Sequence, residues 1–180
     1  MIVRFCAALL AVAILASTVL GGEPFPDIEL NGQQPSVYQT YLETEDTPLH
    51  LSDIPSPYVL IYVFNVYCDA CGKDMPNVNK VFEILDGQGL SNRIKMIGLG
   101  LNNSLFEVNF FRNKFSAPMP VFPYSETGTR ITHGKDDCPV CILIRNDKKS
   151  SPETVLYHDG PVENAEEFAA NVLRSAGYGN

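Results

Sequence analysis

Four cysteines form two CxxC pairs, and thiols at this spacing support more than one kind of chemistry. The pairs are Cys68 with Cys71 in "VYCDACGKDMP" and Cys138 with Cys141 in "KDDCPVCILI". Two thiols three residues apart can close and open a disulfide, and two such pairs can also hold a metal ion. Cysteine is also a common small buried residue. The choice depends on the elements that position each pair.

The first pair lies where a predicted strand meets a predicted helix. Residues 58–67, "YVLIYVFNVY", are apolar on both alternating phases, which is typical of a strand buried on both faces. A helix start stabilises a thiolate through its free N–H groups and its dipole, so Cys68 is expected to attack a disulfide and Cys71 to resolve the product. The helix follows from apolar residues at helical spacing, namely Met75, Val78, Val81, Phe82 and Leu85.

The remaining elements alternate in a way that predicts an α/β fold with a mixed sheet. Residues 22–57 are rich in proline and turn-forming residues, and we expect an irregular N-terminal segment with one or two short strands. Residues 58–180 form the main part of the same domain. Ser104 is a plausible N-cap, and Phe106, Phe110, Phe111 and Phe115 are expected to form a packing face. Strands are predicted at 93–101, 119–124, 140–144 and 153–160, and helices at 104–116 and 164–177.

Residues 1–21 have the features of a secretory signal peptide: a short basic start, a long apolar run and small residues at its end. Cleavage is expected near Gly21, with an uncleaved membrane anchor as the alternative. The chain has 13 basic and 21 acidic residues, and this acidic balance argues against a nucleic-acid partner. Cys6 would leave with the signal. The other four cysteines would then work in an extracytoplasmic space, periplasmic or secreted.

The stretch "VLIYVFNVYCDACGKDMPNVNKV" resembles the TlpA/ResA-like branch of the thioredoxin superfamily, which are exported thiol:disulfide oxidoreductases. In that family an aromatic residue precedes CxxC, and an acid and a proline follow it; here these are Tyr67, Asp74 and Pro76. "PFPDIEL", "LHLSDI" and residues 138–173 extend the resemblance over nearly all of the chain after the signal. It implies a thioredoxin-like three-layer fold, in which helices flank a central mixed sheet.

The resemblance also assigns roles around the first pair. It implies that Asp74 assists proton transfer, although a solvated carboxylate at the helix start is the alternative. Pro139 corresponds to the cis-proline that opens the strand facing CxxC, so Cys138 should lie beside Cys68 and bind the substrate together with Tyr67 and Pro139. The negative charge of Asp69 disfavours the thiolate form of the adjacent Cys68. This effect favours a protein that reduces its substrates.

Three interpretations of the second pair stay open. Cys138 and Cys141 are accessory redox thiols, or they are small packing residues, or some of the sulfurs gather zinc or copper(I), with His133 as a further ligand. The redox interpretation requires neither a metal nor an organic cofactor.

The expected function is therefore disulfide exchange with a cysteine-containing protein substrate, supplied with electrons by a membrane thiol donor. A membrane tether through the N-terminus is compatible with this function. A metal-delivery protein on the same fold is an alternative, although copper chaperones of this fold use CxxxC. A peroxiredoxin-like peroxidase is another, although it would require threonine where this chain has Asn65.

Overall fold

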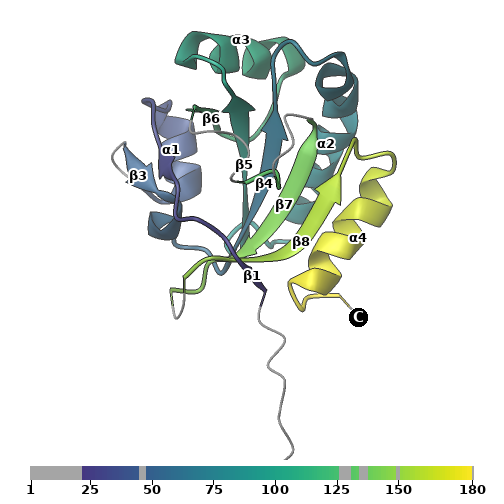
Figure 1. Ribbon diagram of the computed structural model, residues 1–180. Helices are drawn as coiled ribbons and strands as arrows, with labels where there is room; N and C mark the ends of the chain where they lie inside the picture. The colour runs from purple at the N-terminus through teal and green to yellow at the C-terminus, as the bar shows by residue number, and fades with distance from the viewer. Residues whose placement is uncertain (1–21, 45–47, 126–130, 134–137, 149–150, 180) are drawn as a thin grey trace, which may run out of the picture.

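A six-stranded mixed sheet forms the centre of the protein (Figure 1). The computed structural model describes residues 22–44, 48–125, 131–133, 138–148 and 151–179, so the predicted signal peptide lies outside the described residues. The strand order is β1-β8-β7-β4-β5-β6, in which β4, β5 and β6 are parallel and β7, β8 and β1 are antiparallel to their neighbours. The strands are β1 (Glu23–Pro24), β4 (Tyr58–Phe64), β5 (Ile94–Leu101), β6 (Val121–Tyr124), β7 (Val140–Arg145) and β8 (Glu153–Asp159).

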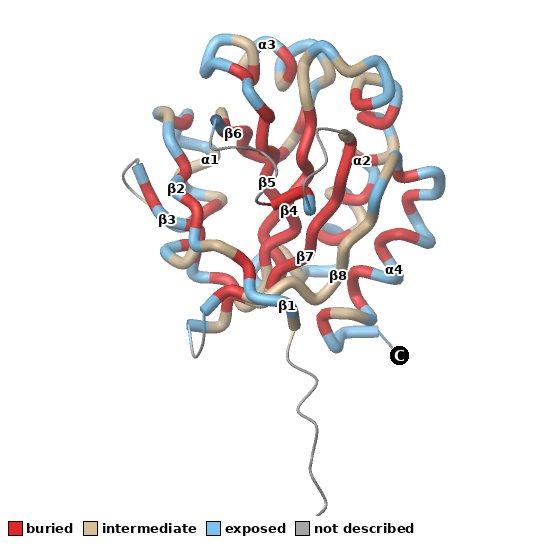
Figure 2. The backbone as a smooth tube through the Cα atoms, in the orientation of Figure 1, coloured by how far each residue is buried: buried red, intermediate tan, exposed pale blue. Residues whose placement is uncertain are grey.

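Both faces of this sheet are covered, which explains why its central strands are apolar on both phases. On β4, Leu60 and Tyr62 belong to one core, whereas Val59 and Ile61 belong to the other. The first core is closed by the helices α2 (Asp69–Gly87), α3 (Leu105–Phe115) and α4 (Ala165–Ser175). The second is closed by the N-terminal segment. Figure 2 shows the central strands buried between these layers, as expected for the predicted three-layer fold.

The N-terminal segment is more regular than its composition predicts. Besides β1 it contains a two-stranded sheet, β2 (Glu29–Leu30) with β3 (Leu49–His50), the short helix α1 (Ser36–Leu42) and a 3-10 turn, η1 (Leu51–Asp53). Helix α1 was not predicted, because it has seven residues and buries only Leu42. On the same helix, the Tyr41 hydroxyl accepts a hydrogen bond from the Met96 N–H at 2.7 Å. This bond connects α1 to strand β5 of the sheet.

Helix α2 starts at Asp69, so Cys68 is its N-cap, as expected for a cysteine at the helix start, and Cys71 lies in its first turn. The predicted cap of α3 is confirmed: the Ser104 hydroxyl accepts from the Glu107 N–H, and Glu107 accepts from the Ser104 N–H in return. None of the described helices is long and apolar enough to cross a bilayer.

The four phenylalanines of α3 do not share one packing face as expected. Phe111 is buried and Phe115 is half-buried against the same core, whereas Phe106 and Phe110 are 78% and 57% exposed. Positions 106 and 110 are four residues apart, so they lie together on the opposite side of the helix. Helix α3 therefore presents two aromatic rings to solvent.

Candidate active site

Cys68 joins the end of the loop after β4 to the first turn of α2. Its Sγ accepts a hydrogen bond from the Cys71 N–H at 3.1 Å, and its thiol donates to the Cys138 carbonyl at 3.2 Å. The helix supplies the free N–H groups and the positive dipole end that stabilise a thiolate at this position. Cys68 is partly exposed, so a disulfide from solution can reach it.

The loop before Cys68 is fixed by Asn65. Its side-chain amide donates to the Leu101 carbonyl at 2.8 Å, and its side-chain oxygen accepts from the Tyr67 N–H at 2.9 Å. The Cys68 N–H donates to the Asn65 carbonyl at 3.0 Å. Asn65 occupies the position where a peroxiredoxin would carry threonine, and its side chain is already used in holding the loop. Sequence reasoning gave Asn65 no structural role, because the partner Leu101 is distant in the sequence.

The second pair approaches the first through its leading cysteine. The Cys138–Pro139 peptide bond is cis, and Pro139 directly precedes β7. The sulfur atoms of Cys68, Cys71 and Cys138 all lie within 4.8 Å of one another. We call these three atoms the sulfur triplet. Hydrogen bonding to Cys138 and burial raise the pKa of the Cys71 thiol. Cys71 is buried, whereas Cys138 is partly exposed.

Cys141 does not belong to the sulfur triplet. It lies opposite Tyr62 in the register between β4 and β7, and its thiol is buried in the core under the helices. Burial and the nearby charge of Asp74 raise the pKa of this thiol. His133, a suggested further ligand, lies 3.9 Å from Glu23 and packs on the ring of Tyr157. Among the described residues, no histidine or carboxylate joins the three sulfurs.

Asp74 is buried one turn after Cys71 on α2. Its Oδ1 accepts from the Val162 N–H at 2.8 Å. Its Oδ2 has no hydrogen-bond partner among the described residues, and the nearby Tyr62 hydroxyl donates to the Cys71 carbonyl at 3.2 Å. Burial raises the pKa of the Asp74 carboxyl, and the Val162 hydrogen bond opposes this effect. The solvated helix-surface carboxylate considered as an alternative does not agree with this burial.

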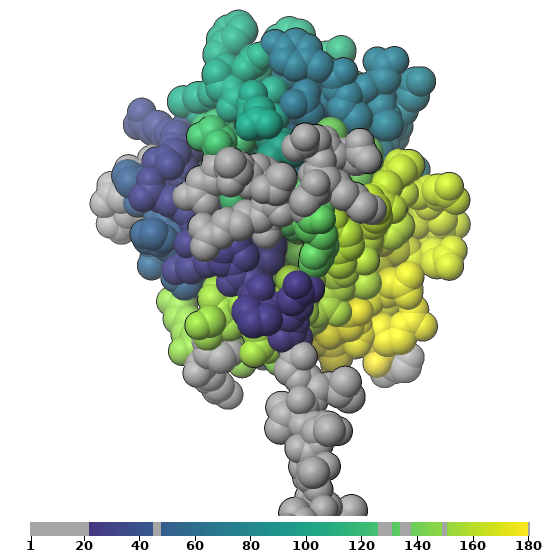
Figure 3. All heavy atoms as spheres, in the orientation of Figure 1, coloured from purple at the N-terminus to yellow at the C-terminus, as the bar shows by residue number. Residues whose placement is uncertain are grey.

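Tyr67 lies on the surface beside Cys68 and is 79% exposed. Its hydroxyl donates to the Glu107 carboxylate, which also caps α3. This bond raises the pKa of Tyr67 and is the main cause that lowers the pKa of Glu107 to about 2. Figure 3 shows α3 in teal beside α2 in darker blue at one end of the molecule. Tyr67 therefore links the surface around Cys68 to the exposed side of α3.

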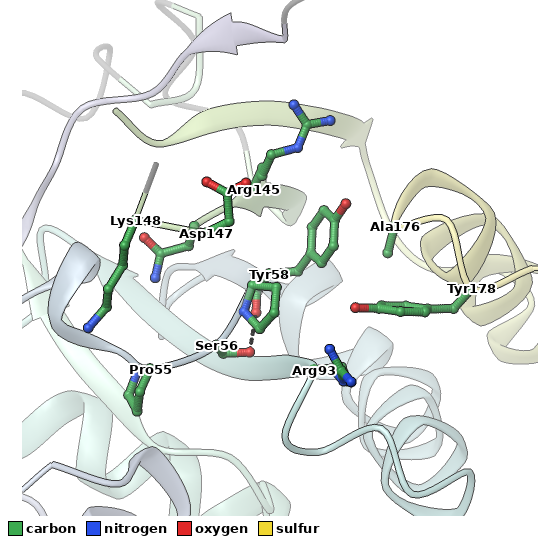
Figure 4. Close-up of a pocket in the computed structure, with 11 residues that line it drawn as sticks. Pro55, Ser56, Tyr58, Arg93, Arg145, Asp147, Lys148, Ala176 and Tyr178 are labelled. Carbon is green, nitrogen blue, oxygen red and sulfur yellow. Dashed lines mark hydrogen bonds between the residues drawn. The ribbon is translucent and has the colours of Figure 1, made fainter. Parts of the chain in front are cut away.

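A wide hollow of the described surface is remote from these sulfurs. It has a volume of about 590 Å³ and includes Tyr58, Arg93, Arg145 and Tyr178 in its lining (Figure 4). Tyr58 opens β4, whereas Cys68 follows the end of the same strand, so the hollow and the sulfur triplet lie at opposite ends of the sheet. The hollow contains no cysteine. It is not the place of the sulfur chemistry.

No protein-family model matches this sequence, and the comparison with curated proteins finds no match. Solved structures do match. A thiol:disulfide interchange protein of the thioredoxin family from Chlorobium tepidum TLS has a TM-score of 0.61 at 14% identity, covering 86% of this chain and 97% of its own. A secreted thiol-disulfide isomerase from Corynebacterium glutamicum has a TM-score of 0.60 at 16% identity, covering 85% of each chain.

A thiol:disulfide interchange protein from Bacteroides sp. gives a TM-score of 0.59 at 13% identity, with 86% of this chain and 88% of that chain covered. The chain thus has the thioredoxin-like fold, with a central mixed sheet flanked by helices. The resemblance to TlpA/ResA-like thiol:disulfide oxidoreductases is supported at the level of the fold.

Proposed function

We propose that this protein is an exported thiol:disulfide oxidoreductase that exchanges disulfides with protein substrates through Cys68 and Cys71. The observation that carries the proposal is the position of the Cys68 sulfur. It caps α2, accepts the Cys71 N–H at 3.1 Å, and has the Cys71 sulfur within 4.8 Å. A thiolate stabilised at a helix start with a second thiol in reach can capture a disulfide and then release it.

The reaction transfers two electrons from the protein to the substrate disulfide. The Cys68 thiolate attacks a substrate disulfide, a bond forms between Cys68 and one substrate sulfur, and the other substrate sulfur leaves and takes a proton. Cys71 then loses its proton and attacks Cys68, which closes the Cys68–Cys71 disulfide and frees the second substrate thiol. The substrate is reduced and the protein is oxidised, and a membrane thiol donor returns the two electrons.

Asp74 is the candidate acceptor for the Cys71 proton. A buried thiol with a raised pKa needs a base to become a nucleophile, and Asp74 lies one turn further along the same helix. A carboxyl group whose own pKa is raised by burial is a stronger base than a solvated one. Asp74 thus assists the second step rather than the first.

Tyr67, Cys138 and Pro139 are the candidate substrate-binding residues. The Cys138 carbonyl is 3.2 Å from the Cys68 sulfur, so a bound peptide would pass beside this backbone. The exposed Tyr67 ring offers apolar contact on the adjoining surface. A reducing direction is favoured by Asp69, whose negative charge adjoins Cys68 at the start of α2.

The test is selective alkylation followed by substrate trapping. In the reduced protein at neutral pH, iodoacetamide should modify Cys68 faster than Cys141, and mild oxidation should yield a Cys68–Cys71 disulfide identified by peptide mass spectrometry. The variant Cys71→Ser should retain a fraction of the substrate on Cys68 as a mixed disulfide that reductant releases, whereas the wild-type protein should retain none. If sulfurs 68 and 71 do not join on oxidation, the proposal is wrong.

Cys138 should also take part in this exchange, because its sulfur belongs to the triplet. We expect Cys71→Ser to hold the mixed disulfide incompletely, since Cys138 can attack Cys68 in place of Cys71. The double variant Cys71→Ser/Cys138→Ser should hold it fully, whereas Cys71→Ser/Cys141→Ser should behave like the single variant. Equal trapping by all three would assign Cys138 a packing role only. Non-reducing electrophoresis measures the trapped fraction.

A further inference from the structure

The sulfur triplet has the dimensions of a metal site. Three atoms at most 4.8 Å apart have a common point about 2.8 Å or less from each of them, which is 4.8 divided by the square root of three. Metal–thiolate bonds are about 2.3 Å long, as for zinc. Each sulfur would therefore have to move by roughly 0.5 Å at most to bind one ion. Side-chain rotation alone supplies a movement of this size.

The donor set of this site is all sulfur. In the part of the chain that the structure describes, no imidazole or carboxylate belongs to the group. Thiolates select soft ions, and copper(I) is the soft ion that accepts three thiolates in a trigonal arrangement. Structural zinc sites normally have four ligands, so a set of three sulfurs suits zinc less well.

The start of α2 favours negative charge at one of the sulfurs, that of Cys68, and burial restricts access to the site from the Cys71 side. Cys68 caps the 19-residue helix α2 and already accepts the Cys71 N–H. The positive end of the helix dipole thus offsets part of the charge that thiolate ligands would bring. Cys71 is buried and Cys68 and Cys138 are partly exposed, so an ion could enter from the Cys68 side and end at a site shielded on the Cys71 side.

We propose that the reduced protein binds one copper(I) ion through the sulfurs of Cys68, Cys71 and Cys138. Binding forms three copper–sulfur bonds, and the thiol protons that they displace go to solvent, so neither copper nor sulfur changes its oxidation state. Closing the Cys68–Cys71 disulfide removes two of the three ligands. Copper binding and disulfide exchange therefore exclude each other in one molecule, and the ion would inhibit the exchange reaction.

The experiment is anaerobic titration of the fully reduced protein with copper(I), using bicinchoninate as the competing chelator. The wild-type protein should bind one ion per chain, and X-ray absorption at the copper edge should show three sulfur neighbours. Loss of an outer-shell partner of a metal site costs roughly 10–100-fold in affinity, so Cys138→Ala, which removes a ligand, should cost at least that much. The variants Cys68→Ala and Cys71→Ala should lose as much.

Cys141→Ala is the matched control, because Cys141 is a buried cysteine on β7, three residues after Cys138, that lies outside the triplet. Its copper affinity should equal that of the wild-type protein, and circular dichroism checks that each variant is folded. The proposal is overturned if Cys138→Ala binds copper(I) as tightly as the wild-type protein, or if four-coordinate zinc binds more tightly than copper(I). Insulin reduction by the same preparations separates this result from the proposed function, since equilibrium binding requires no turnover.

Discussion

Asp74 is a buried carboxyl group with fewer hydrogen-bond donors than it can use. Val162 supplies one backbone N–H to Oδ1, and Oδ2 has no bond of normal geometry. A buried polar atom without a partner costs on the order of 1–3 kcal/mol. We interpret this cost as the consequence of keeping a base near Cys71, because a better-satisfied carboxylate would hold protons less readily.

Replacing Asp74 by asparagine should therefore stabilise the protein and slow its reaction. Because burial raises the pKa of this carboxyl above its ordinary value of 3.8, the folded protein holds the proton more tightly than the unfolded chain. Stability from this group is present at low pH and is lost as pH rises from 3.8 through the raised pKa. Asp74→Asn should thus be more stable at neutral pH, by on the order of 1 kcal/mol, and equally stable at low pH.

Urea unfolding across this pH range measures the first effect, and stopped-flow reduction of a model disulfide measures the second. The rate of Cys71 attack should fall, whereas the rate of the first attack by Cys68 should stay the same. Asp86→Asn, on the exposed part of the same helix, is the control for loss of one negative charge. A variant that loses stability at neutral pH would contradict this account of Asp74.

At the scale of elements, most of the sheet could be predicted from sequence, because strands buried on both faces leave long apolar runs. Strands β4, β5 and β7 are of this kind. Helix α1 could not be predicted, since its stability comes from a contact with β5 rather than from its own pattern. Cys68 and Cys71 could be recognised from their spacing.

The contacts that hold the site could not be found in the same way. The bonds from Asn65 to Leu101 and from Tyr67 to Glu107 join positions 36 and 40 residues apart, and no local periodicity reports such pairs. The position of Cys138 beside Cys68 came from the family resemblance, because the two residues are 70 positions apart. Local pattern thus indicated the thiols to which we assign the reaction, whereas their surroundings could be found only in the folded chain.

The exposed aromatic residues of α3 form a candidate contact surface for a protein substrate. Phe106 and Phe110 are exposed on the helix to which Tyr67 is bound through Glu107. Exposed aromatic rings on a helix that is tied to the loop before Cys68 suit contact with a protein substrate, and truncating an anchor of this kind costs about 1 kcal/mol or more, roughly fivefold in affinity. The variant Phe106→Ser/Phe110→Ser should therefore lower kcat/KM for a protein disulfide at least fivefold, mainly through KM.

Reduction of a small disulfide such as hydroxyethyl disulfide should not change in this variant, because a small substrate does not reach α3. Val37→Ser is the control for loss of an exposed apolar side chain, since Val37 is 65% exposed on α1, whose buried residue Leu42 belongs to the second core. Equal losses for the protein and the small substrate would mean that α3 supports the site structurally instead of contacting the partner.

At the scale of the whole molecule, the proposed reaction is confined to one end of the sheet. The sulfur triplet lies after the C-terminal end of β4, and the hollow of Figure 4 lies at its N-terminal end. Arg145, which lines the hollow, forms an ion pair with Glu153 of the adjacent strand β8 at 3.1 Å. Both side chains are partly exposed. Such a pair contributes up to about 1 kcal/mol to the free energy of unfolding, and neither of its side chains takes part in the proposed reaction.

Arg145→Ala should therefore lower the free energy of unfolding by at most about 1 kcal/mol and leave disulfide exchange unchanged. Chemical denaturation gives the first quantity, and insulin reduction gives kcat and KM for the second. High salt should reduce the stability difference between the variant and the wild-type protein, because it screens the lost ion pair. If Arg145→Ala lost exchange activity while keeping its stability, the hollow would have to belong to the substrate-binding surface, and the reaction could not be confined to the cysteine end of the sheet.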